Sequence, residues 1–406
     1  MNNSLSRRKE ILTPPTDGIV KIFVCGPTVY DYAHLGHART YVAFDIMARY
    51  LKFLGYKIRT VVNITDVAER IVDRAEDLKR DPLEFAREYE KAFLEDMQSL
   101  GISEIDGYER ASEYVPQMIS QVRQLIDKGA AYETDTGVYF DVNKFPSFGK
   151  LSGQSKEELG LRRLELCSSK RNPEDFSIWR KYEKGFGWDS PWGFGRPGWH
   201  IEDTAISMTN LGETYDIHGG ASELIFPHHE AEIAQAEALT GMSPFVRFWL
   251  HTGLLNVKGR KMSKSLGNVI RIRDALRKYK APELRYYFAS FHYREPLVMS
   301  ETELRQPKRE LQVLERNFNA FMEIQPRKDA SSDSKKLRAI IRNAEKAFRQ
   351  HMDNDFDTPK ALRSLKSMSE KLSIFAKPTV RVDRQSKLYA EEVFRRMAEV
   401  FGILSR

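Results

Sequence analysis

Apolar and polar residues near the start of the chain follow an order that predicts a strand, a helix and a second strand. Residues 18–26 (GIVKIFVCG) are largely apolar and β-branched and end at a glycine, which is typical of a buried strand. Residues 35–55 carry apolar side chains at helical spacing and also stop at a glycine. Residues 57–65 (KIRTVVNIT) predict another strand. This order is the unit of a parallel doubly wound sheet, which binds ligands beyond the carboxyl ends of its strands. We therefore expect a site around residues 25–37 and 63–66.

The pattern changes further along the chain. Two amphipathic segments, Pro82 to Leu100 and Val115 to Lys128, precede two short strand patterns around Thr134 to Gly137. We take this hairpin as part of an α+β insertion at about residues 105–197. From Glu301 onward the sequence is helical in character, and Thr358 with Pro359 predicts an N-cap followed by a first-turn proline. The predicted organisation is an α/β domain over residues 1–300 and an all-α helical bundle over residues 301–406.

Composition narrows the class of protein. The chain has 406 residues, of which 41% are apolar and 30% charged, and no apolar run reaches the roughly 18 residues of a membrane helix. The N-terminus lacks the apolar segment and cleavage site of a secretory signal. Two cysteines cannot build a disulfide framework. We expect a cytoplasmic protein, without a membrane partner.

The net charge of +7 lies entirely in residues 301–406, because residues 1–300 are balanced. Within the balanced part, residues 201–250 carry −7 and residues 251–300 carry +8. A basic block is either a solvated helix face or a surface for a phosphate-rich partner. The sequence leaves both interpretations of the bundle open.

Two short motifs carry candidate phosphate chemistry. HLGH places His34 and His37 three residues apart at the start of the predicted helix, beside free backbone N–H groups and the positive end of the helix dipole. KGRKMSKSLGN, at residues 258–268, is a cationic loop rich in hydroxyl groups. Each motif alone is explained as well by capped or surface histidines and by an exposed basic turn. Together, the two motifs predict a clamp for a triphosphate that neutralises charge during displacement at the α-phosphorus.

HLGH and KMSKS resemble the two signatures of class I aminoacyl-tRNA synthetases. The surrounding FVCGPTVYDYAHLGHARTYVAFD, VNITD, RPGWHIE, DIHGGASELIFPHHEAEIAQ and MDNDFDTPKAL are similar to cysteinyl-tRNA synthetases in particular. The resemblance implies a Rossmann-like catalytic domain, ATP with Mg²⁺, and transfer of an activated amino acid to tRNA. It implies catalytic roles for His34, His37, Lys261 and Lys264, and ATP-binding roles for Gly36, Asp216, His218, Gly219, Ser263 and Ser265.

The same resemblance implies a zinc ion that selects cysteine by taking its thiolate as a ligand. The matching ligand positions are Cys25, Asp203, His228 and Glu232, with Asp203 where the family has a second cysteine. Aspartate binds zinc with the formal charge of a thiolate but is a harder ligand. The alternative is an amino-acid pocket shaped by Thr65, Trp199 and Cys25 without metal. Cys167 matches no ligand of the family.

Three functions remain open on the sequence alone. The first is a cysteine–tRNA ligase, acting as a monomer on cysteine and on tRNA, with tRNA(Cys) the expected substrate. The second is a ligase that joins an activated amino acid to a small amine, as in mycothiol biosynthesis, because the chain ends where cysteinyl-tRNA synthetases usually continue into a small anticodon-reading domain. The third is a non-catalytic paralogue, which Asp203 favours and the two intact signatures oppose.

Overall fold

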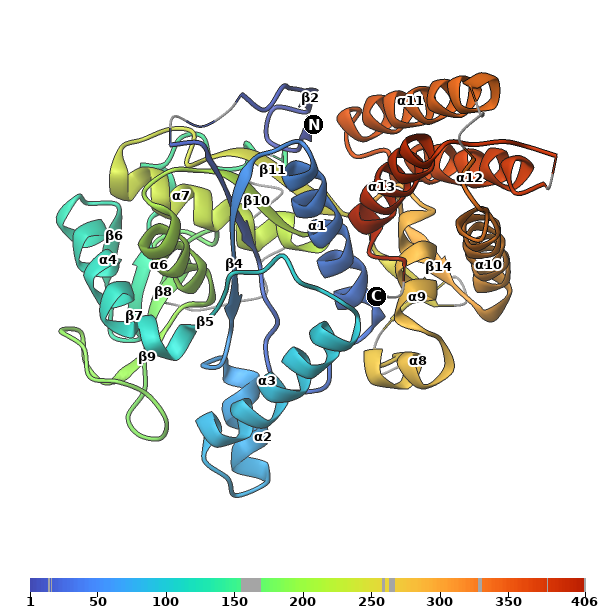
Figure 1. Ribbon diagram of the computed structural model, residues 1–406. Helices are drawn as coiled ribbons and strands as arrows, with labels where there is room; N and C mark the ends of the chain where they lie inside the picture. The colour runs from blue at the N-terminus through green and yellow to red at the C-terminus, as the bar shows by residue number, and fades with distance from the viewer. Residues whose placement is uncertain are drawn as a thin grey trace.

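The structure is a computed structural model that describes residues 1–404 except 14, 16, 155–168, 258–259, 263–266, 328–330 and 378. Its centre is a five-stranded parallel sheet in the order β11-β10-β3-β4-β5 (Figure 1). The strands are β3 (Ile19–Val24), β4 (Lys57–Ile64), β5 (Gly107–Arg110), β10 (Tyr215–Ala221) and β11 (Val246–Thr252). The predicted strand, helix and strand unit is confirmed, because α1 (Leu35–Phe53) joins β3 to its parallel neighbour β4.

Alternating side chains give the sheet two apolar faces. In β3, Ile22 and Val24 belong to the hydrophobic cluster that includes α1, whereas Phe23 between them faces the cluster on the other side. Gly55 follows the end of α1 with φ of +95°, the left-handed conformation that favours glycine after a helix. The predicted end of this helix is therefore confirmed.

The second face of the sheet is covered by helices and a smaller antiparallel sheet (Figure 1). That sheet has the order β6-β7-β8-β9. Its strands are β6 (Ala131–Glu133), β7 (Gly137–Phe140), β8 (Phe176–Lys181) and β9 (Gly195–Pro197). Pairing of β6 with β7 confirms the predicted hairpin. The helices on this face are α4 (Val115–Asp127), α6 (Trp199–Leu211) and α7 (Glu230–Thr240). The helices α2 (Glu69–Asp77) and α3 (Pro82–Ser99) lie with α1 instead, because their buried side chains, such as Ile71 and Phe85, belong to the same hydrophobic cluster as those of α1.

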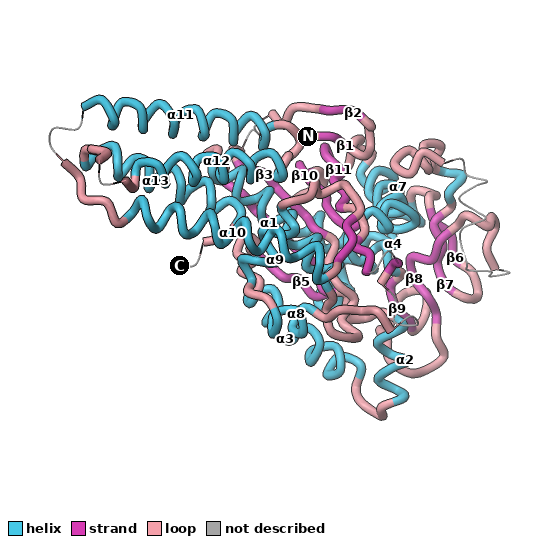
Figure 2. Tube along the Cα trace, turned by 90° about the vertical axis from the view of Figure 1, so that its right-hand side faces the viewer, coloured by secondary structure: helices cyan, strands magenta, loops and turns pink. Residues whose placement is uncertain are grey.

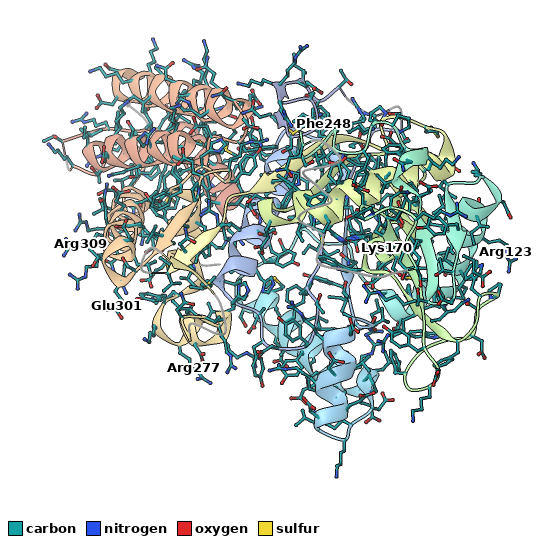
Figure 3. The ribbon with its side chains drawn as sticks, turned by 180° about the vertical axis from the view of Figure 1, so that it is seen from behind. Arg123, Lys170, Phe248, Arg277, Glu301 and Arg309 are labelled. Atoms are coloured by element: carbon teal, nitrogen blue, oxygen red, sulfur yellow. The ribbon has the colours of Figure 1, made fainter. Side chains whose placement is uncertain are left out.

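The C-terminal part of the chain is helical and packs against α1 (Figures 1 and 2). Its helices are α8 (Ile272–Lys278), α9 (Ala281–Ala289), α10 (Glu301–Met322), α11 (Ser331–Asp353), α12 (Thr358–Phe375) and α13 (Arg384–Phe401). Short strands complete the fold: β1 (Asn2–Asn3) with β2 (Arg8–Lys9), and β12 (Leu255–Val257) between β13 (Arg260–Lys261) and β14 (Leu297–Met299). Charged side chains such as Arg123, Arg277 and Arg309 point outward (Figure 3). A membrane-spanning helix is not found in the described part of the chain.

One predicted helix start is wrong by one residue. Asp357, not Thr358, is the N-cap of α12, because its carboxylate accepts the backbone N–H of Lys360 at 3.2 Å. Thr358 and Pro359 are instead the first two helical residues. Aspartate is at least as good an N-cap as threonine, and here it has the geometry to reach the third helical N–H.

A buried guanidinium joins the sheet domain to the last helix. Arg285 of α9 is 1% exposed and donates to Asp45 Oδ2 of α1 at 2.5 Å and to the carbonyl oxygen of Phe401 at 2.7 Å. Burial opposes ionisation of Asp45, but Arg285 and Arg49 outweigh it and hold the pKa of this carboxyl below its usual value. Gly402 follows α13 with φ of +63°, and a Cβ there would lie 2.6 Å from Arg285 Nε.

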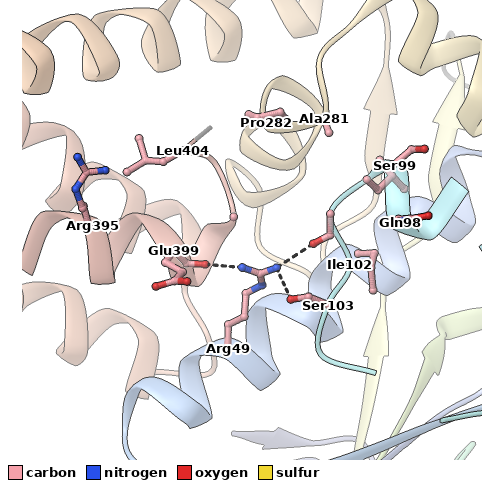
Figure 4. Close-up of a pocket in the computed structure, with 13 residues that line it drawn as sticks. Arg49, Gln98, Ser99, Ile102, Ser103, Ala281, Pro282, Arg395, Glu399 and Leu404 are labelled. Carbon is pink, nitrogen blue, oxygen red and sulfur yellow. Dashed lines mark hydrogen bonds between the residues drawn. The ribbon is translucent and has the colours of Figure 1, made fainter. Parts of the chain in front are cut away.

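Arg49 extends this junction to the surface. Its guanidinium donates to the carbonyl oxygens of Glu399 and Gly101 and to Ser103 Oγ, at distances of 2.8–3.0 Å (Figure 4). These contacts lie at a cavity of about 580 Å³ between α1, the end of α3, α9 and α13. The helical bundle is thus attached to the domain of the parallel sheet through charged hydrogen bonds to backbone carbonyls as well as through apolar packing.

Asp45→Asn should therefore destabilise the protein, because it leaves Arg285 buried without its charged partner. Breaking a buried pair in this way costs about 3–5 kcal/mol. Glu391→Gln, which breaks the exposed Glu391–Arg395 pair of α13, should cost about 0.5 kcal/mol or less. Urea unfolding followed by circular dichroism measures both variants. Equal, small losses for the two would contradict a structural role of the buried pair.

Candidate active site

A cavity of about 390 Å³ opens at the carboxyl ends of β3 and β10. Cys25, directly after β3, and Ala221, the last residue of β10, line it together with His34 and His37. Its other lining residues are Gly26, Pro27, Thr28, Tyr30, Asp31, Tyr32, Thr40, Tyr41, Arg70, Trp199, Glu223, Leu224, Met262 and Val269. The structure thus brings the first signature and part of the second to one cavity, at the edge where a parallel sheet binds ligands.

His34 and His37 cap the amino end of α1. His34 Nδ1 accepts the backbone N–H of Gly36 at 3.1 Å, and His37 Nδ1 accepts the backbone N–H of His34 at 3.2 Å. The rings stack with centroids 4.0 Å apart. Because both Nδ1 atoms accept, each neutral imidazole carries its proton on Nε2. The caps therefore fix both rings as Nε2–H donors at the positive end of a helix dipole.

Gly36 keeps this corner compact. A Cβ at this position would lie 2.9 Å from the His34 ring and 3.3 Å from Met262 Cε. A side chain would therefore push the first signature away from the second.

The segment that follows the second signature is joined to the start of α1 by backbone hydrogen bonds. Leu35 N donates to the carbonyl oxygen of Ile270, and Ile272 N donates to that of Ala33, both at 3.0 Å. Lys261 belongs to β13 and pairs with Asn256 of β12. The other predicted residues of the loop, Lys258, Ser263, Lys264 and Ser265, lie outside the described residues, as does Cys167.

The four predicted metal ligands come together beneath the cavity. His228 Nε2 lies 3.2 Å from Asp203 Oδ2 and 3.2 Å from Glu232 Oε1. The ligand atoms of Cys25, Asp203 and His228 all lie within 4.8 Å of one another. These four residues form the ligand cluster. Asp203 comes from α6, Glu232 from α7, and His228 from the turn that precedes α7.

The ligand cluster contains buried carboxylates that need a positive charge to compensate them. Asp203 and Glu232 are 0% exposed, and neither oxygen of Glu232 receives a hydrogen bond from the described residues. Burial and then Asp203 raise the pKa of Glu232, and burial, Asp203 and Glu232 raise the pKa of the Cys25 thiol. His218 also contacts Glu232, but burial lowers the pKa of its imidazole well below the usual value. A neutral imidazole does not compensate a buried carboxylate.

The spacing of the ligand cluster fits zinc. Zinc bonds to nitrogen and oxygen are about 2.0–2.1 Å long, so neighbouring ligands of a tetrahedral ion lie about 3.3 Å apart. The two measured separations from His228 Nε2 are 3.2 Å. Sulfur, nitrogen and carboxylate oxygen are all established zinc ligands. The residues present therefore fit the ion.

Several neighbours orient this cluster, and the sequence analysis missed most of them. His200 Nδ1 lies 2.8 Å from His228 Nδ1, which leaves His228 Nε2 for the cluster. Trp199, a predicted pocket residue, stacks on the His228 ring at 4.1 Å. Asn63 donates to Asp203, and His229 pairs with His251 at 2.9 Å. In the sequence, these contacts were indicated only by the adjacent His228 and His229 and by the polar Asn63 between apolar neighbours in a predicted strand.

Thr65 is buried just after β4, where its hydroxyl accepts from Asn63 at 3.3 Å. It pairs with Thr28, a lining residue of the cavity, in an isolated bridge. Thr65 thus lies beside the cavity without lining it.

Three residues predicted to contact ATP do not line this cavity. Asp216 is the second residue of β10, pairs with Arg247 at 2.8 Å, and is about 16 Å along the strand from Ala221 at the cavity. His218 receives a hydrogen-bond contact from Tyr215 at 2.7 Å and faces the ligand cluster. Gly219 gives close packing, since a Cβ there would overlap the Phe44 ring at 2.0 Å. The contacts of these three residues with ATP stay predictions.

Comparisons with known proteins identify the class. The family model described as tRNA synthetases class I (C) catalytic domain matches residues 11–309, and the DALR domain model matches residues 347–405. The crystal structure of Mycobacterium tuberculosis methionyl-tRNA synthetase bound by methionyl-adenylate has the same fold, with a TM-score of 0.68 and 15% identity over 95% of this chain and 90% of that one. Fold and family model together define a class I tRNA synthetase.

The curated relatives define the family within that class. The cysteine–tRNA ligase of Thermococcus onnurineus is 44% identical over 99% of this chain and 85% of its own length. The cysteine–tRNA ligase of Pyrococcus abyssi is 45% identical over the same shares. The chain belongs to the cysteine–tRNA ligase family, and its activity is the ATP-dependent joining of cysteine to tRNA.

Adding Zn²⁺ to metal-free protein should raise its melting temperature, because the ion compensates the buried carboxylates. Free zinc at 100 times the dissociation constant stabilises by about 2.7 kcal/mol. Glu232→Gln should abolish the rise, since an amide replaces a ligating carboxylate. Glu230→Gln is the matched control: Glu230 lies on the same helix but accepts backbone N–H groups of Gly149, Leu151 and Ser152. A full response to zinc by Glu232→Gln, measured by differential scanning calorimetry, would contradict the assignment.

Proposed function

We propose that this cavity forms cysteinyl-adenylate and transfers cysteine to tRNA(Cys), with zinc in the ligand cluster as the selector of the amino acid. The observation that carries the proposal is that one cavity joins the capped histidines of α1 to a buried set of sulfur, nitrogen and oxygen ligands. A phosphate-binding corner and a thiol-selecting site are the two parts that activation of cysteine by ATP requires.

In the first step, the carboxylate of cysteine attacks the α-phosphorus of ATP, and the bond to the bridging oxygen breaks as pyrophosphate leaves. His34 and His37 donate from Nε2 to phosphate or ribose oxygens, and Gly36 leaves room for them. Lys261 and Lys264 neutralise charge that develops on the phosphates, and Ser263 and Ser265 add hydroxyl donors. Mg²⁺ accompanies the ATP.

Amino-acid selection is assigned to the other end of the cavity. Cys25, Asp203, His228 and Glu232 hold the zinc ion, which when bound supplies a Lewis acid with affinity for a substrate thiolate. Trp199 lies over the His228 ring and closes one wall, while Thr65 supports the strand end beside it. A serine hydroxyl is a much weaker ligand for the ion, so the cluster discriminates between two amino acids of similar size.

In the second step, a ribose hydroxyl at the 3′ end of tRNA attacks the activated carbonyl, and AMP leaves. The charge of +7 on residues 301–406 supports contact of the bundle with the tRNA backbone. We assign residues 1–300 to catalysis and residues 301–406 to tRNA binding. The protein is proposed to act in the cytoplasm as a monomer.

The test is pyrophosphate exchange into ATP with each of the twenty amino acids, followed by aminoacylation of tRNA(Cys) transcript. We expect exchange with cysteine only, and stable cysteinyl-tRNA. Exchange with cysteine but no charging of tRNA would indicate transfer to another acceptor, such as a small amine. Exchange with a different amino acid, or none, would contradict the proposal.

A further inference from the structure

The two oxygens of Asp203 have different surroundings. Oδ2 faces the ligand cluster, 3.2 Å from His228 Nε2. Oδ1 accepts a hydrogen bond of 2.8 Å from Asn63 Nδ2. Both side chains are 0% exposed, so water does not compete for either oxygen.

Asn63 is itself held in one orientation. Its Oδ1 accepts the backbone N–H of Gly26 at 2.6 Å, which requires the oxygen of the amide on that side. Its Nδ2 therefore faces Asp203 and Thr65. Gly26 has no room for a side chain, because a Cβ would lie 1.5 Å from the carbonyl oxygen of Asn63. The donor reaches Asp203 from a rigid strand end.

We propose that Asn63 is a positioning residue that makes Asp203 a ligand through one oxygen only. The proposal rests on the zinc site of the proposed function. A carboxylate binds a metal ion through one or both oxygens, and the second mode raises the coordination number. By occupying Oδ1, Asn63 leaves Oδ2 as the single ligand atom and keeps a coordination position for the substrate sulfur. Hydrogen-bonded partners of this kind orient metal ligands and tune the ion they hold.

Glu232 differs from Asp203 in this respect. Its Oε1 lies 3.2 Å from His228 Nε2 and its Oε2 lies 3.5 Å from His218 Nε2, but neither oxygen receives a hydrogen bond from the described residues. The hydrogen bond from Asn63 to Asp203 Oδ1 is therefore the contact that carries single-oxygen ligation in the ligand cluster.

The proposal predicts that the effect of replacing Asn63 on zinc affinity depends on the residue at position 203. A general structural role of Asn63 does not predict this. A thiolate has one ligand atom and needs no donor to hold a second, so Asn63 should matter with Asp203 present and not after Asp203→Cys. N63A also removes the hydrogen bond to Gly26. The effect of that loss on zinc affinity is the same with Asp203 and with D203C, so it cancels in the double-mutant cycle.

The experiment measures zinc affinity by competition with a chromophoric chelator for the unaltered protein, N63A, D203C and N63A/D203C. We expect N63A to weaken binding by about 10–100-fold when Asp203 is present, and by no more than about twofold in the D203C background. Cobalt substitution gives a second readout, because loss of four-coordinate geometry weakens the visible absorption of Co²⁺. N63A should weaken that absorption only beside Asp203.

If N63A does not fold, N63L replaces it, since leucine keeps the branched shape of asparagine and also removes the donor to Asp203; the loss of the Gly26 contact again cancels in the cycle. Circular dichroism of the metal-free proteins serves as the control for folding. Equal losses of affinity in both backgrounds would overturn the positioning role while leaving the zinc site intact. Absence of zinc binding by the unaltered protein would overturn the zinc site and the positioning role together.

Discussion

The burial of two carboxylates against one imidazole is the constraint on which the rest of the site depends. Asp203 and Glu232 lie on separate helices, and both approach His228 Nε2 at 3.2 Å. Without a cation, this arrangement carries a large desolvation cost, and the raised pKa of Glu232 expresses it. A divalent ion supplies the positive charge that these buried carboxylates lack. The packing of α6 against α7, which brings these two carboxylates together, is therefore explained by a bound cation.

Sheet topology places that centre next to the cavity that the capped histidines line. The strands β3 and β10 are neighbours and parallel, so Cys25 and Ala221 emerge at the same edge. The capped start of α1 lies at this edge because the connection from β3 is short. Hydrogen bonds from Leu35 and Ile272 then join the segment that follows the second signature to the start of α1. The reacting groups are thus oriented by backbone structure, while the bundle is attached through the buried Arg285–Asp45 pair.

Sequence reasoning predicted the order of elements well, because apolar periodicity and the glycine after α1 are local signals. It placed the N-cap of α12 at Thr358 instead of Asp357, since both residue types cap helices and only the geometry selects one. The four metal ligands were predicted from resemblance to a family, not from spacing. Their convergence depends on three segments that are remote in sequence.

The remaining contacts had no sequence signal strong enough to predict them. Asn63 and His200 act through buried hydrogen bonds to residues on other elements, and a single sequence does not specify such pairs. Asp216 and Gly219 were assigned to the nucleotide by resemblance to the family, and both lie on β10, whose last residue lines the cavity. The structure places them earlier on that strand, where Arg247 and Phe44 are their partners.

The most direct test of the central claim is zinc K-edge X-ray absorption of the purified protein, recorded alone, with cysteine and with serine. The account predicts one sulfur ligand, from Cys25, in the free protein, and a second sulfur when cysteine is added but not with serine. A zinc environment that is unchanged by cysteine would contradict the claim that this cluster selects the amino acid through its thiolate.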